Sequence, residues 1–111
     1  MLIMNDIEWL EPWIEVKAEK QKYLEAELKR EVKPGHPLYQ VDVKAVAKRL
    51  DCDDVLFSLI NHSSAFAVVH LTYAVSEVSP KWPHTRLFSS LEDWIEGCMM
   101  SDHEDYGQDD S

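Results

Sequence analysis

The chain has 111 residues, of which 45% are hydrophobic, and its 21 acidic residues outnumber 11 basic ones to give a net charge of −10. This length and hydrophobic content are typical of one folded domain and exclude a disordered chain. The charge argues against direct binding of nucleic acid or of anionic membranes, because both depend on Lys and Arg. It favours a basic protein surface as partner, although solubility alone would also account for it.

The cysteines and the start of the chain indicate the compartment. Cys52 and Cys98 form no CxxC pair, match no zinc spacing and are too few for a disulfide scaffold. The first residues lack the basic segment of a signal peptide. No stretch approaches the roughly 18 apolar residues of a membrane span. We therefore expect a cytoplasmic protein.

The first predicted element is a long N-terminal helix from Pro12 to about Val32. Helix-forming residues dominate this segment, which has no glycine and ends before Pro34-Gly35. An apolar stripe at helical spacing runs through it, made of Trp13, Val16, Tyr23, Leu24 and Leu28. We expect the stripe to pack on the chain's own sheet, and the alternative is a homodimer through this helix.

The following segments predict strands. From Val41, apolar residues alternate with polar ones as in a half-buried strand, although residues 43–50 also fit a helix with Asp42 as its cap. We favour the strand. Two apolar runs, 55–60 and 65–73, flank a polar break and read as a hairpin that forms the core. Residues 83–88 are expected to add a short extended piece.

A short helix from Leu91 to about Met100, capped by Ser89 or Ser90, is expected to complete a single domain over residues 1–100. We expect an acidic C-terminal tail over residues 101–111, because closely spaced like charges give it no reason to fold. The fold class predicted is α+β: a long N-terminal helix, an antiparallel meander of three or more strands and a short C-terminal helix. Both helices are expected on one face of the sheet.

Four stretches carry a resemblance to known proteins: HPLY, DDVLF, AVVHLTY and WPHT…FSSLEDW, in this order. They resemble a family of small, mostly uncharacterised bacterial proteins, over the part of the chain from about Glu27 to Trp94. The resemblance implies a compact bacterial α+β domain. It implies no activity, cofactor or catalytic residue, and it leaves the first helix and the tail uncovered.

The candidate chemistry centres on His70, which lies in the second apolar run beside Thr72. A histidine there is typical of a hydrogen-bonded structural residue. The functional alternative makes His70 a general base with Asp54 or His84, in a small enzyme or ligand-binding domain around His70, Thr72 and the Asp51–Asp54 turn. The aspartates of the Asp51–Asp54 turn are explained first by the preference of Asp for turn positions. The five histidines show no HExxH and no i, i+4 pair, so we predict no metal site. The sequence also has no GxSxG, no P-loop and no GxGxxG, and we predict no cofactor and no catalytic residue.

Binding is the better-supported function. Trp82 stands in a predicted loop between Lys81 and Pro83, and tryptophan is enriched at binding hot spots. The tail adds charges that would steer a basic partner, namely Asp102, Glu104, Asp105, Asp109 and Asp110. We therefore predict a non-enzymatic, acidic protein-binding module. Its most concrete form is an immunity- or antitoxin-like inhibitor of a basic toxin such as a nuclease.

Overall fold

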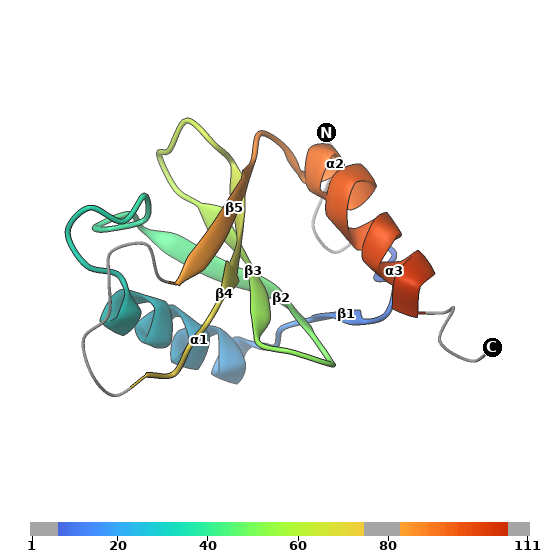
Figure 1. Ribbon diagram of the computed structural model, residues 1–111, viewed down its shortest axis with the longest axis horizontal. Coiled ribbons are helices and arrows are strands. Elements are labelled where there is room, and N and C mark those ends of the chain that lie inside the picture. Colours follow the sequence, from blue (N-terminus) through green and yellow to red (C-terminus); the bar gives the residue numbers. More distant parts are fainter. Residues whose placement is uncertain (1–6, 75–82, 107–111) are drawn as a thin grey trace.

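The computed structural model describes residues 7–74 and 83–106. They form a five-stranded antiparallel sheet in which each strand pairs with the next along the chain (Figure 1). The α+β class and the antiparallel meander are confirmed. The elements are β1 (Trp13–Glu15), α1 (Ala18–Glu31), β2 (Val43–Arg49), β3 (Asp54–Leu59), β4 (Phe66–His70), β5 (His84–Phe88), α2 (Leu91–Trp94), a π-helical segment (Ile95–Met99) and α3 (Met100–Tyr106).

The N-terminal helix is shorter than predicted. Helix α1 has 14 residues, and the segment before it is the edge strand β1, which pairs with the end of β2. Trp13 is fully buried, whereas Ile14 and Glu15 are exposed, so the strand is identified by its pairing with β2 and not by alternating burial. A buried residue followed by two exposed ones also fits the start of a helical stripe. The predicted end of the helix was correct, since α1 ends at Glu31. Gly35 takes a φ of 101° in the turn that follows, a conformation that glycine adopts readily.

The segment that fitted both a strand and a helix is the strand β2. Ala45 pairs with Phe57 and Ala47 with Leu56, so Val46 is the extra residue of a β-bulge. The bulge changes which face the side chains occupy. Ala45 packs towards α1, whereas Val46 and Ala47 both pack towards the C-terminal helix.

The predicted core hairpin is confirmed as β3 and β4, which lie at the centre of the sheet. Val55 and Phe57 point to one face of the sheet and Leu56 points to the other, and all three are completely buried. Burial on both faces explains why this segment is apolar throughout instead of alternating.

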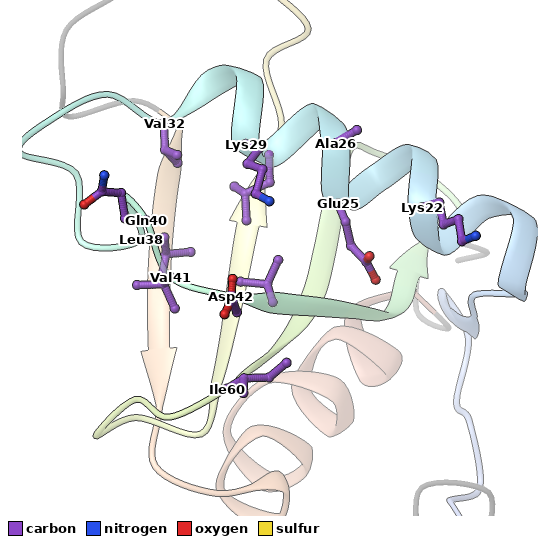
Figure 2. A pocket seen from close by; sticks show the side chains of 12 residues that line it. Lys22, Glu25, Ala26, Lys29, Val32, Leu38, Gln40, Val41, Asp42 and Ile60 are labelled. Carbon is purple, nitrogen blue, oxygen red and sulfur yellow. The ribbon is translucent and has the colours of Figure 1, made fainter.

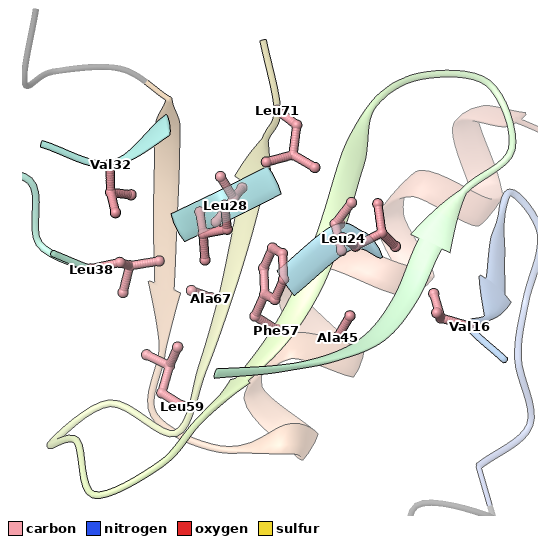
Figure 3. Packing of buried hydrophobic residues seen from close by; sticks show 12 residues of the cluster. Val16, Leu24, Leu28, Val32, Leu38, Ala45, Phe57, Leu59, Ala67 and Leu71 are labelled. Atoms are coloured by element: carbon pink, nitrogen blue, oxygen red, sulfur yellow. The ribbon is translucent and has the colours of Figure 1, made fainter. Parts of the chain in front are cut away.

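Helices therefore cover both faces of the sheet, and the prediction that they share one face was wrong (Figure 1). On one face, Leu24 and Leu28 of α1 pack against Phe57 and its neighbours (Figure 3). On the other face, Trp94 and Met99 of the C-terminal helix pack on Leu56 and Val68. A hairpin that is apolar on both faces requires a cover on each.

The C-terminal helix extends further than predicted. Ser90 caps its start, accepting a hydrogen bond of 3.0 Å from the backbone N–H of Asp93. The helix continues without interruption through the π-helical segment and ends at Tyr106. Residues 101–106, which belong to the predicted acidic tail, are therefore helical. Within the described parts of the chain, no helix is long and apolar enough to cross a membrane.

Candidate functional site

The structure brings His70 and Asp54 together at one end of the sheet. Strand β3 begins with Asp54, β4 ends with His70, and the register pairs the two residues directly. His70 Nδ1 lies 2.7 Å from Asp54 Oδ1. The next strand places His84 opposite His70. Because side chains alternate along strands, all three residues lie on the face covered by the C-terminal helix.

Cys52 joins this group from the turn before β3. One potential metal-ligand atom from each of Cys52, Asp54 and His70 lies within 4.8 Å of those of the other two. Burial raises the pKa of the Cys52 thiol, whereas a hydrogen bond to the Asp54 backbone acts to lower it. Thiol, carboxylate and imidazole are the side chains that bind zinc-class ions, so the group has the composition of a metal-ligand set.

Thr72 does not belong to this group. It lies beyond the end of β4, where its backbone N–H and its hydroxyl both donate to Glu31 Oε1 at 2.9 and 3.0 Å. The N–H of Tyr73 donates to Glu31 Oε2 at 2.8 Å, and Tyr73 has a φ of 55°. Burial raises the pKa of Glu31, whereas these hydrogen bonds lower it. The carboxylate thus fixes a backbone conformation that is uncommon for an aromatic residue, which is a structural role.

A groove of about 500 Å³ lies elsewhere, between α1 and the segment 38–43 (Figure 2). Leu28, Val32 and Leu38 form its apolar part, and Lys22 and Lys29 lie at its rim. None of His70, Thr72 and Asp54 lines it. This groove therefore does not support the hypothesis of an enzyme around His70.

Acidic and basic residues are unevenly distributed along the chain. Residues 1–16 and 87–111 contain twelve Asp and Glu and no Lys or Arg, whereas residues 17–86 contain nine acids and eleven bases. The described parts of these two terminal segments pack together: Trp9 and Trp13 contact Trp94 edge-on, and His103 Nδ1 lies 2.6 Å from the Glu11 carbonyl oxygen. We call residues 7–15 and 91–106 the acidic layer.

Eight carboxylates of the acidic layer are exposed, namely Glu8, Glu11, Glu15, Glu92, Asp93, Glu96, Glu104 and Asp105. Two of the predicted partner-binding residues, Glu104 and Asp105, are thus placed on an accessible surface. Sequence reasoning found only the tail part of this surface. The absence of Lys and Arg before residue 17 and after residue 86 was a visible signal, but the sequence did not show that the two ends meet.

Asp102 has a different environment from its neighbours. Its carboxylate accepts a hydrogen bond of 2.9 Å from Trp13 Nε1 and lies 3.3 Å from Arg49 Nη1. Cys98 Sγ lies 3.4 Å away, and burial raises the pKa of this thiol to about 11. Asp102 therefore joins the C-terminal helix to β1 and β2. Trp82, Asp109 and Asp110 lie outside the described residues.

The pairing of His70 with Asp54 leads to a prediction about stability. The His70 side chain is 52% exposed, so we expect His70→Gln to change the free energy of unfolding by less than about 1 kcal/mol. Urea denaturation followed by circular dichroism measures this change. A loss of more than about 2 kcal/mol would mean that His70 is a structural core residue.

No protein-family model, curated protein or solved structure matches this chain. The family resemblance of residues 27–94 therefore stays a prediction, and the function has to be argued from the site itself.

Proposed function

We propose that this protein is a non-enzymatic binding module whose acidic layer recognises a basic surface on a protein partner. The observation that carries the proposal is the separation of charge. The acidic layer and the termini beyond it hold all of the net negative charge, whereas the rest of the chain has two more bases than acids. A negative electrostatic potential concentrated on one side of a protein orients an approaching basic protein and raises its association rate.

Helix and strand hold these carboxylates in place. The acids at 92, 93, 96, 104 and 105 lie on a helix that is fixed to the sheet by buried Trp94 and Met99. Charges on a rigid element need little ordering when a partner binds, so less of the interaction energy is lost. This supports recognition of a defined surface and goes beyond a general role in solubility.

In its most concrete form, the proposal is an immunity- or antitoxin-like inhibitor that binds a basic toxin. An enzyme that acts on nucleic acid has a positively charged cleft, because it must neutralise phosphates. A small protein with an acidic helical face can block such a cleft by charge complementarity. The small size of the chain and its net charge of −10 support this class of partner.

The alternatives draw less support. An enzyme around His70, Thr72 and Asp54 would need these residues to converge, and Thr72 instead contacts Glu31. A homodimer through α1 would need an exposed apolar stripe, and Leu24 and Leu28 are 1% and 2% exposed.

The test compares two variants that lose equal charge. Glu92→Gln/Glu96→Gln/Glu104→Gln neutralises three exposed acids of the acidic layer. Its matched control, Glu19→Gln/Asp42→Asn/Asp53→Asn, neutralises three exposed acids elsewhere. Tagged proteins are used to recover a binding partner from the source cells, which mass spectrometry identifies. Association rates with that partner are then measured by stopped flow at low and high salt.

We expect the acidic-layer variant to associate about tenfold or more slowly at low salt, and the control variant to keep a near wild-type rate. The difference should shrink as salt screens charges beyond about 10 Å at 0.1 M. Equal slowing in both variants would indicate net charge alone. Equal rates for all three proteins at low salt would contradict the proposal.

A further inference from the structure

We propose that Cys52, Asp54 and His70 form a surface site for a divalent transition-metal ion of the zinc class. The site is separate from the proposed partner-binding role, because none of its three residues belongs to the acidic layer. It rests on the kinds of ligand that meet there, on their separations and on the rigidity of the elements that carry them.

The ligand atoms lie near enough to one another to converge on a single ion. Zn–S, Zn–N and Zn–O distances imply ligand separations of about 3.3 Å for N to O and about 3.6 Å for S to N. His70 Nδ1 and Asp54 Oδ1 are 2.7 Å apart, and each of the three residues has a ligand atom within 4.8 Å of those of the others. Side-chain rotations that move the ligand atoms by about an ångström would let an ion take the place of the contact between His70 and Asp54.

The backbone positions of the ligands are fixed. Asp54 and His70 are directly paired in the central hairpin. The turn that carries Cys52 is held to both neighbouring strands. Lys48 Nζ donates to the Cys52 carbonyl oxygen at 2.8 Å, and the Leu71 N–H donates to the Asp53 carbonyl oxygen at 3.1 Å. A site held by paired strands needs little reorganisation when an ion binds.

The ligand set selects the class of ion. Thiolate and imidazole favour zinc and similar ions over Mg²⁺ and Ca²⁺, which prefer oxygen ligands alone. Three protein ligands leave one tetrahedral position, and His70 is exposed enough for water to occupy it.

The experiment uses the full chain, reduced and freed of metal by a chelator. Co²⁺ is added as a spectroscopic probe, because a bound thiolate gives a charge-transfer band in the near ultraviolet. Zn²⁺ is then titrated against a chromophoric chelator to measure affinity. We expect one Co²⁺ per chain, the thiolate band, and displacement of Co²⁺ by Zn²⁺.

Variants assign the ligands. Cys52→Ser should abolish the band and weaken Zn²⁺ binding by on the order of 100-fold, and His70→Gln and Asp54→Asn should each weaken it by at least about 10-fold. Cys52→His should lose the band and keep Zn²⁺ binding. The matched control Cys98→Ser should leave both unchanged. A melting curve for each variant confirms that it is folded. No thiolate band in the wild type, a band that survives Cys52→Ser, or one that disappears in Cys98→Ser would overturn the proposal.

Discussion

Replacing Trp13 with alanine should lower the free energy of unfolding by about 3–5 kcal/mol, the largest effect that we expect from a single substitution in this chain. The Trp13 side chain is completely buried, and its ring meets Trp94 edge-on at 5.2 Å between centroids. Its Nε1 donates to Asp102. One residue of β1 thus connects the edge of the sheet to both ends of the C-terminal helix, and alanine would remove the packing and the hydrogen bond together.

A second variant separates the two contributions. Trp13→Phe keeps most of the aromatic packing but removes the hydrogen bond to Asp102, which should cost about 1.5–3 kcal/mol. Both variants are measured by urea denaturation with far-ultraviolet circular dichroism, because removing a tryptophan alters fluorescence. A cost below about 1 kcal/mol for Trp13→Ala would mean that the first residues do not pack on the sheet in solution. The acidic layer would then not exist as one surface.

The elements that were predicted correctly are those whose sequence patterns are local and do not depend on pairing with a distant segment. The core hairpin was visible because its residues are apolar on both faces, and the end of α1 because Pro34-Gly35 stops a helix. Strand β1 was missed because its three residues gain their strand conformation only by pairing with β2. The sequence does not record which segment a distant strand will pair with.

The same limit applies to the candidate sites. The proximity of Asp54 and His70 depends on the register of the hairpin, and a shift of one residue would turn the two side chains to opposite faces. The helical start of the acidic tail depends on Arg49, which ion-pairs with Asp102 from 53 positions earlier in the chain. Local charge counting predicted repulsion because it could not include this distant cation.

Replacing Leu24 with alanine should lower the free energy of unfolding by about 2–5 kcal/mol, as a cavity in the core between α1 and the sheet. Leu24 is 1% exposed and lies beside Phe57 (Figure 3), in the core cluster that also includes Val55. The matched control is Tyr23→Ala on the same helix. Tyr23 is 54% exposed and stacks on Tyr73, so its loss should cost less than about 1.5 kcal/mol.

Sedimentation of the wild type and of both variants at several concentrations decides whether this helix has a second role. If α1 serves only its own sheet, Leu24→Ala should lower stability without changing the mass of the particle in solution. A different result would assign the exposed side of α1 to an interface between copies of the chain. In that case the wild type would be a dimer, and Tyr23→Ala would be a monomer of unchanged stability, because the Tyr23 side chain contributes little to the core. A small stability loss in Leu24→Ala would contradict the packing of α1 on the sheet. Leu24 is 1% exposed, and truncating a leucine that is buried to this extent leaves a cavity that its neighbours fill only in part.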